Sequence, residues 1–141
     1  MDQKKTKVMV VEDEEILLTA LSEELKQEGF EVVGAKDGVE GVEKAASEKP
    51  DLILLDLVMP RLDGIGALKQ MKDNPETKEI PVVILTNLSD YDKVSDALSL
   101  GAMDYLVKAN YRLEELVNNI KTVLERKQSG MPNIPPAMPA A

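Results

Sequence analysis

The sequence predicts a doubly wound α/β fold, in which a five-stranded parallel sheet carries five helices on its two faces. Three observations predict it. Apolar runs of strand length alternate with segments of helical period. The run before Asp56 is apolar at nearly every position, as expected for a central strand covered on both faces. Polar residues also stand repeatedly where such runs end, and right-handed crossovers would bring those ends to one edge of the sheet.

The first half of the chain gives three strands and two helices. A β-rich run at 7–11 precedes an acidic cluster and a helical pattern that Gly29 ends. A weaker strand follows at 30–35, and Asp37 with Glu40 three residues later resembles a reciprocal helix cap. The third strand, 52–55, ends at Asp56, and the turn residues Met59-Pro60 and Asp63-Gly64 come before the next helix.

The second half repeats the alternation. A helix over 64–72 stops at Asn74-Pro75, and the apolar run 82–85 ends in Thr86. Ser89 and Asp92 form a capping-box start for a helix that Gly101 ends. The strand 104–107 leads to Lys108, and the clearest amphipathic helix follows, with its end near Lys127 and apolar positions Leu113, Leu116, Val117, Ile120, Val123 and Leu124.

Length and composition bound the domain organisation. The 141 residues have room for one domain with a proper core, predicted over 1–128, and we expect no second folded output domain. Residues 129–141 contain four of the eight prolines and no charged side chain, so we expect a disordered tail. No apolar segment approaches the roughly 20 residues needed to cross a bilayer, and the start lacks the apolar core of a signal peptide. A cytoplasmic protein without membrane insertion is therefore predicted.

Charge and residue usage exclude several kinds of chemistry. The 26 acidic and 17 basic residues give a formal charge of −9, which would repel nucleic-acid phosphates, so direct nucleic-acid binding is not expected. Cysteine and histidine are both absent, which removes disulfides, thiolate chemistry, the commonest general base and the commonest transition-metal ligand. Oxygen chemistry from Asp, Glu, Thr and Ser remains.

The parallel sheet would gather five polar residues at one edge: Glu12, Asp13, Asp56, Thr86 and Lys108. Carboxylates that close repel one another and would be partly protonated unless a cation lies among them. A hard divalent ion, Mg²⁺ in the cell, suits such oxygen ligands. With a metal ion and a lysine nearby, one carboxylate can attack a phosphoryl group while the others hold the ion. This set predicts an aspartyl-phosphate site.

Each of these residues also has an ordinary structural interpretation. Asp13 could be a helix N-cap, Glu12 a solvated loop acid, and Asp56 a cap for the next turn. Similarly, Thr86 could be a β-branched strand end, Lys108 a surface lysine, and Tyr105 a half-buried ring with its hydroxyl in solvent. The convergence of five strand ends on one reactive set favours the functional interpretation.

Four segments together resemble response regulator receiver domains of two-component signalling, over roughly residues 5 to 127. They are VVEDEE after the first strand, DLILLDLVMPRLDG around the third, PVVILT for the fourth and GAMDYLVK for the fifth. The resemblance implies the flavodoxin-like receiver fold, with Asp56 as phosphoacceptor. It also implies Mg²⁺ ligation by Glu12, Asp13, Asp56 and the main-chain carbonyl of Val58, a switch pair of Thr86 and Tyr105, and a Lys108 that pairs with the acyl phosphate.

The implied activity is a phosphorylation-dependent switch rather than an enzyme acting on other substrates. A histidine kinase or histidine phosphotransfer protein would donate its phosphoryl group to Asp56. Thr86 would then shift and Tyr105 would occupy the vacated space, which selects one of two packings of the fourth helix, fifth strand and fifth helix. That surface would signal to a separate protein. The sequence leaves open whether phosphorylation also drives homodimerisation, and whether the protein is instead a phosphate sink.

Three features depart from the family pattern. Ala109 follows Lys108 where the family usually has a proline in a cis peptide, and a cis bond at a non-proline residue would cost about 3 kcal/mol. Val58 and Leu88, at positions that in the family often influence how water reaches the acyl phosphate, are apolar. We therefore expect slow self-dephosphorylation. The third departure is the Pro-rich tail, which nothing in the sequence explains.

Three rival functions fit the sequence less well than the switch does. A haloacid-dehalogenase-like phosphatase needs a second acid two residues after its nucleophile, where this chain has Val58. A phosphorylation-independent binding module would not need the reactive set at the strand ends. A flavodoxin-like cofactor binder shares the topology, but the acidic edge would repel a flavin phosphate.

Overall fold

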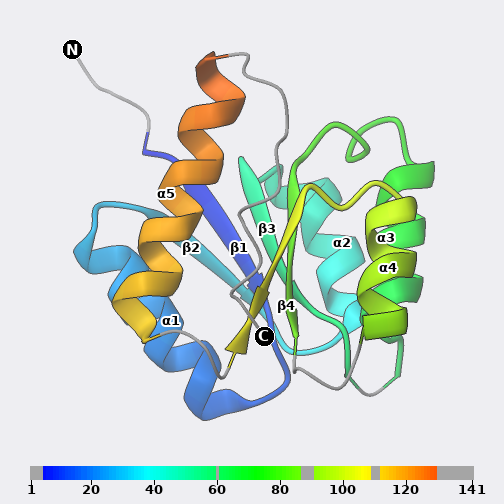
Figure 1. Ribbon diagram of the computed structural model, residues 1–141, viewed down its shortest axis with the longest axis horizontal. Coiled ribbons are helices and arrows are strands. Elements are labelled where there is room, and N and C mark those ends of the chain that lie inside the picture. The colour runs from blue at the N-terminus through cyan, green and yellow to red at the C-terminus, as the bar shows by residue number, and fades with distance from the viewer. Residues whose placement is uncertain (1–4, 60, 87–90, 109–111, 130–141) are drawn as a thin grey trace.

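Ten elements alternate along the described chain, five strands and five helices. The computed structural model describes residues 5–59, 61–86, 91–108 and 112–129. The elements are β1 (Lys7–Val11), α1 (Glu15–Gln27), β2 (Glu31–Ala35), α2 (Gly38–Glu48), β3 (Leu52–Asp56), α3 (Gly64–Asp73), β4 (Val82–Thr86), α4 (Tyr91–Ser99), β5 (Asp104–Val107) and α5 (Leu113–Ser129). Their arrangement is shown in Figure 1. The predicted βα alternation is confirmed.

The strands form one parallel sheet with the order β2-β1-β3-β4-β5. The register pairs Val11 with Leu55, Asp56 with Leu85 and Thr86 with Val107. The strand order reverses beside β1, which is the topological switch point at which open α/β sheets place their ligands. The doubly wound α/β fold predicted from the sequence is therefore confirmed.

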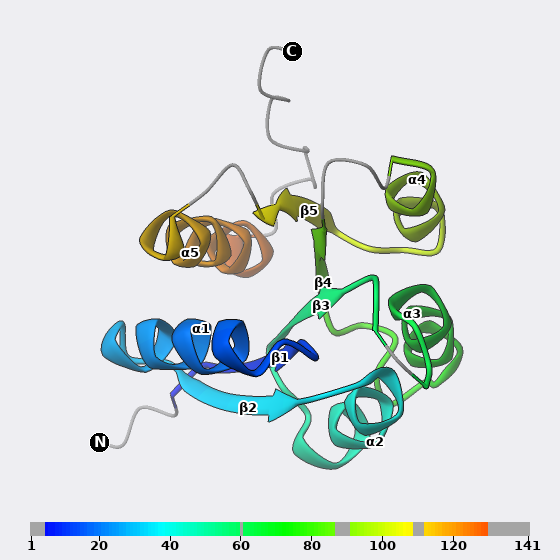
Figure 2. The same ribbon diagram turned by 90° about the horizontal axis from the view of Figure 1, so that it is seen from below.

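Helices cover both faces of the sheet, as the view in Figure 2 shows. Helices α1 and α5 lie over one face, where Leu21, Leu25 and Ile120 join one apolar cluster. Helices α2, α3 and α4 lie over the other face, where Leu68 and Val94 join a second cluster. Because both faces are covered, every residue of β3 and β4 is buried, which explains their nearly uninterrupted apolar sequences.

Two predicted helix starts are resolved in detail. Asp37 caps α2 by accepting a hydrogen bond from the Glu40 N–H at 2.8 Å, but the predicted reciprocal bond is replaced by an ion pair between the Glu40 and Lys44 side chains. This i,i+4 partner lies on the same helix face and competes for the Glu40 carboxylate. Asp63 caps α3 through the Gly66 N–H. The predicted capping box that begins at Ser89 lies outside the described residues.

The last helix is slightly longer than predicted. It runs to Ser129 rather than ending near Lys127, so it includes the first residue of the segment predicted as a tail. The sequence has no strong helix breaker before Gly130, which accounts for the extension. The rest of that segment, 130–141, lies outside the described residues. Among the helices that are described, none combines the length and the apolar character needed to span a membrane.

Candidate acidic site at the strand ends

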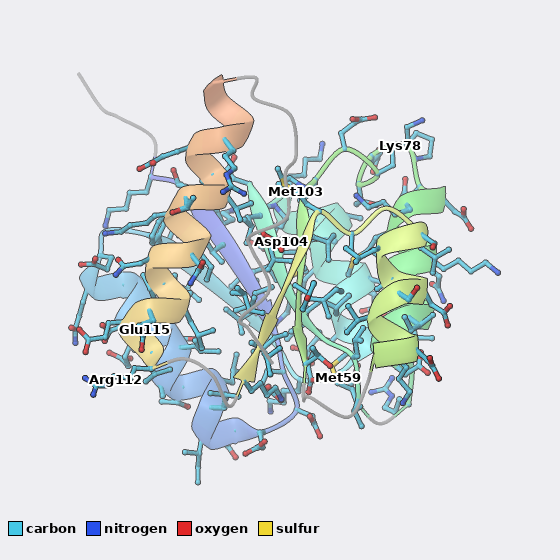
Figure 3. All side chains as sticks on the ribbon, viewed as in Figure 1. Met59, Lys78, Met103, Asp104, Arg112 and Glu115 are labelled. Carbon is cyan, nitrogen blue, oxygen red and sulfur yellow. The ribbon has the colours of Figure 1, made fainter. Side chains whose placement is uncertain are left out.

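The sheet brings the predicted site residues to the carboxyl edge of its strands. Asp56 is the last residue of β3, Thr86 is the last residue of β4, and Lys108 directly follows β5. Glu12 and Asp13 follow β1, whose last residue pairs in register with Leu55. In Figure 1 this is the edge to which the strand arrows point, and Figure 3 labels Met59 there, three residues after Asp56. Residues from four strand ends therefore meet in one place.

Glu12 is fully buried, contrary to the interpretation of a solvated loop acid. Its N–H donates to the Ala35 carbonyl at 2.9 Å, and its Oε2 accepts from the Glu14 N–H at 3.0 Å. Its Oε1 lies 2.9 Å from the Lys108 Nζ, yet within the described structure no donor meets it at a hydrogen-bonding angle. A buried carboxylate oxygen with one ionic contact is poised to accept a further cation.

Asp56 lies beside the same lysine. The carboxylate is almost completely buried, its Oδ1 accepts from the Val58 N–H at 3.3 Å, and its Oδ2 lies 3.3 Å from the Lys108 Nζ. Lys108 therefore bridges two carboxylates, and its own side chain is only 18% exposed. These contacts argue against a simple turn cap at Asp56 and against a simple surface lysine at 108.

Asp13 completes the acidic cluster from the solvent side. Carboxylate oxygens of Glu12, Asp13 and Asp56 all lie within 4.8 Å of one another. The N-cap residue of α1 is Glu14, without a side-chain capping bond, so Asp13 is not the helix cap that its position suggested. Asp13 is exposed, whereas Glu12 and Asp56 are buried.

Burial dominates the electrostatics of the site. Burial raises the pKa of Glu12 to about 7, although Lys108 and the Glu14 N–H act in the opposite direction. Burial likewise raises the pKa of Asp56, opposed mainly by Lys108. Burial alone would lower the pKa of Lys108, but the two carboxylates outweigh it and raise that pKa above its usual value. Two buried acids, Glu12 and Asp56, share one lysine, so added positive charge would stabilise their ionised forms.

The donor set fits a hard divalent cation. The cluster offers only oxygen ligands, and the buried Oε1 of Glu12 has room in its coordination for one more positive partner. Carboxylates of Glu12, Asp13 and Asp56 would hold the ion. The predicted fourth ligand, the main-chain carbonyl of Val58, belongs to the loop that leaves Asp56, and the Val58 side chain is half exposed.

The predicted switch residues share one face of the sheet. Thr86 is buried, and Ile84, two residues earlier on the same face, pairs in register with Tyr105. The Tyr105 ring is half-buried and packs against the apolar cluster beneath α2, α3 and α4. Both side chains thus lie on the face that α4 covers. Two other residues of interest, Leu88 and Ala109, lie outside the described residues, and so does the peptide bond that joins Lys108 to Ala109.

Sequence reasoning missed the residues that support the loop after Asp56. Gly64 packs so closely that a Cβ there would lie 2.4 Å from the Asp56 carbonyl oxygen. Arg61 adopts a left-handed backbone with φ of 68° and forms an ion pair with Asp37 at 3.1 Å. The Asp63-Gly64 turn signal pointed to Gly64, but no sequence pattern links Arg61 to Asp37 across 24 residues.

Known proteins are similar to this chain in both sequence and fold. The chain is 39% identical over 128 residues to the alkaline phosphatase synthesis transcriptional regulatory protein PhoP of Bacillus subtilis, covering 90% of this chain and 52% of the relative. It is 42% identical over 123 residues to the response regulator ArlR of Staphylococcus saprophyticus, covering 86% and 54% respectively. The chain thus spans about half the length of these curated relatives.

Solved structures of response regulators have the same fold as this chain. A putative response regulator from Chloroflexus aurantiacus superposes with a TM-score of 0.79 and 30% identity, covering 87% of this chain and all of that one. The receiver domain of the Francisella response regulator 1452 gives a TM-score of 0.77 and 28% identity, covering 87% and 99%. The sequence profile described as "Response regulator receiver domain" matches residues 8–121. The chain therefore belongs to the response regulator receiver domain family.

Proposed function

We propose that this protein is a cytoplasmic phosphorylation switch in which Asp56 accepts a phosphoryl group from the phosphohistidine of a histidine kinase or histidine phosphotransfer protein. The observation that carries the proposal is the placement of Asp56. It is a buried carboxylate at the end of a central strand, 3.3 Å from a lysine and within 4.8 Å of two further acids. Receiver domains in general support phosphorylation-based signalling, and this chain belongs to that family.

The transfer exchanges one bond for another. An oxygen of the Asp56 carboxylate attacks phosphorus, a P–O bond forms, and the P–N bond to the donor imidazole breaks with its electron pair leaving on nitrogen. Lys108, which already contacts Asp56, neutralises charge on the transferring group. Bound Mg²⁺ would supply further positive charge to the phosphoryl oxygens. No histidine is present in this sequence, so none of its residues can supply the phosphohistidine.

The signal would leave the protein through α4, β5 and α5. Thr86 ends β4 directly beside the acceptor strand, and Tyr105 lies on β5 on the same sheet face. A hydrogen bond from Thr86 to the new phosphoryl oxygens would draw that side chain toward the site and favour an inward Tyr105. The result is a shift between two packings of this surface, which a separate target protein would recognise.

We further propose that the protein catalyses only its own phosphorylation and a slow self-dephosphorylation. Val58 presents an apolar side chain, 51% exposed, two residues after the acceptor. An apolar group in that place cannot orient a water molecule for attack on the acyl phosphate. A long-lived phosphorylated form suits a switch whose target is a separate protein that it must find by diffusion.

The test is intact mass spectrometry after incubation with acetyl phosphate and Mg²⁺. The parent protein should gain one phosphoryl group, and the gain should be lost in Asp56→Asn and in a chelated sample. Asn has nearly the same shape as Asp, so the variant removes the nucleophile while it preserves packing. A parent protein that gains no mass, or an Asp56→Asn variant that gains as much as the parent, would refute the proposal.

A further inference from the structure

The connection between β2 and α2 contacts both loops that carry the acidic site. At its start, the Ala35 carbonyl accepts the Glu12 N–H at 2.9 Å, which anchors the loop after β1. Two residues later, the Asp37 Oδ2 accepts from the Arg61 Nη1 at 3.1 Å, which anchors the loop after β3. One short segment thus joins the two ligand-bearing loops, although none of its own side chains belongs to the acidic cluster.

Arg61 is held in an unfavourable backbone conformation. Its φ of 68° lies in the left-handed region, where an L-residue other than glycine loses about 1–2 kcal/mol. Lys49 shares this feature, but it does so as the ordinary C-cap of α2. Arg61 instead lies in the loop that follows the acceptor. Such conformations persist when the surroundings hold them, and here Asp37 supplies a partner whose side chain is only 11% exposed.

The main chains of the two segments also meet. A Cβ on Gly38, the first residue of α2, would lie 2.0 Å from the Leu62 carbonyl oxygen. Earlier in the same loop, Leu57 and Met59 are buried in the core. The loop is therefore held on one side of Val58 by Asp56, and on the other side by Met59, by Arg61 and by the contact with α2.

We propose that Arg61 and Asp37 are positioning residues for the phosphoacceptor site, whose ion pair fixes the loop main chain that carries the Val58 carbonyl. The inference rests on the proposed function, because the site positioned is the one at which Asp56 would be phosphorylated. Neither residue belongs to the acidic cluster, so the pair acts through the backbone. Its loss should loosen divalent-cation binding and slow phosphorylation while the fold remains intact.

The test uses variants that keep the local backbone conformation. Asp37→Asn retains the amide oxygen that caps α2, since Asn is as good an N-cap as Asp, but it removes the charge. Arg61→Gly removes the guanidinium and relieves the left-handed strain. The double variant and the conservative Arg61→Lys complete the set. For each protein, titration calorimetry gives the Mg²⁺ dissociation constant, mass spectrometry the rate of phosphorylation by acetyl phosphate, and urea denaturation the stability.

Each single variant should bind Mg²⁺ about two- to fivefold more weakly than the parent and should be phosphorylated more slowly by a similar factor. This is the range expected for an ion pair with one exposed partner. The double variant should be no worse than either single variant, Arg61→Lys should recover part of the loss, and Arg61→Gly should be at least as stable as the parent. Parent-like Mg²⁺ binding in both single variants, or losses that add in the double variant, would overturn the inference. A parent that is not phosphorylated refutes the proposed function instead, and the Mg²⁺ titration still decides on the ion pair.

Discussion

The Nζ of Lys108 lies 2.9 Å from the Oε1 of Glu12, a carboxylate with no exposed surface. The same ammonium group lies 3.3 Å from Asp56, so one lysine compensates two buried acids. If one charge of such a cluster is removed, the remaining charges stay buried without a partner. This strongly destabilises the folded state. Lys108 therefore has a structural role before any phosphoryl group arrives.

We predict that Lys108→Gln lowers the free energy of unfolding of the metal-free protein by about 1–3 kcal/mol. Addition of Mg²⁺ should recover more stability in the variant than in the parent, because the cation no longer competes with an ammonium group. Urea denaturation with and without Mg²⁺ measures both effects. Lys121→Gln is the matched control, since Lys121 pairs with Glu28 between α5 and α1 on the surface. Equal losses in the two variants would contradict the role given to Lys108.

Gly64 fixes the start of α3 against the acceptor loop. A Cβ there would lie 2.4 Å from the Asp56 carbonyl oxygen and 2.5 Å from the Leu57 Cα, both backbone atoms that cannot move aside cheaply. Gly64→Ala should therefore destabilise the protein by about 1–3 kcal/mol. It should also weaken Mg²⁺ binding, because the displaced main chain leads directly to Val58.

Gly34 provides the control for this substitution. A Cβ on Gly34 would meet only the Leu18 side chain, at an ordinary 3.5 Å. Gly34→Ala should be neutral or should stabilise the protein by about 0.5 kcal/mol, because Ala loses less backbone entropy than Gly in a strand. Thermal denaturation of both variants checks the pair of predictions. A Gly64→Ala variant as stable as Gly34→Ala would show that the close contact relaxes freely.

The sequence predicted the fold well because the apolar runs, the helix stop signals and the glycines at helix ends all indicated the same elements. The buried strand before Asp56, the Asn74-Pro75 stop and the left-handed Gly29 and Gly101 all appear where local chemistry required them. The cluster of Glu12, Asp13 and Asp56 followed from parallel topology, which carries every strand end to one edge. The local sequence pattern and the parallel topology together were sufficient to predict that these three acids lie close together.

Two features that the sequence could not predict depend on long-range contacts. The burial of Glu12 follows from the path of its loop, which the Ala35 carbonyl fixes across the sheet. The ion pair of Asp37 with Arg61 joins two loops with no periodic relation. The expected Glu40 half of the α2 capping box was wrong, because Lys44 competes for the same carboxylate. The first two cases involve partners far apart in the sequence, whereas Lys44 lies only one helical turn from Glu40.

Asp104 lies at the opposite end of the sheet, where Figure 3 labels it at the start of β5. Its carboxyl group should make the stability of the protein depend on pH. The side chain is 3% exposed, and burial raises its pKa above the usual 3.8, opposed by the Tyr105 N–H and by Arg126. The folded state therefore holds this proton more tightly than the unfolded state does. As pH rises from 3.8 through the raised folded pKa, Asp104 makes a growing unfavourable contribution to stability.

Asp104→Asn removes that contribution and still presents an oxygen to the Tyr105 N–H. The stability of the variant relative to the parent should therefore rise across this pH window and level off above it. Urea denaturation of both proteins at a series of pH values gives the difference directly. A difference that stays constant, or that falls as pH rises, would mean that the carboxyl is not held in its protonated form by burial.

The apolar side chain of Val58 should set the lifetime of the phosphorylated protein. Val58 is half exposed, so replacing it should change the stability by no more than about 0.5 kcal/mol and leave its main-chain carbonyl in place. In Val58→Asn the side-chain amide can hydrogen-bond a water molecule beside the acyl phosphate, which Val cannot do. Dephosphorylation, followed by mass spectrometry after removal of acetyl phosphate, should be severalfold faster than in the parent. Val58→Leu is the matched control and should keep the long lifetime, because it changes size without adding a polar group. If Val58→Asn and Val58→Leu lose the phosphoryl group equally fast, access of water is set by another part of the loop, and the apolar character of residue 58 is not what protects Asp56.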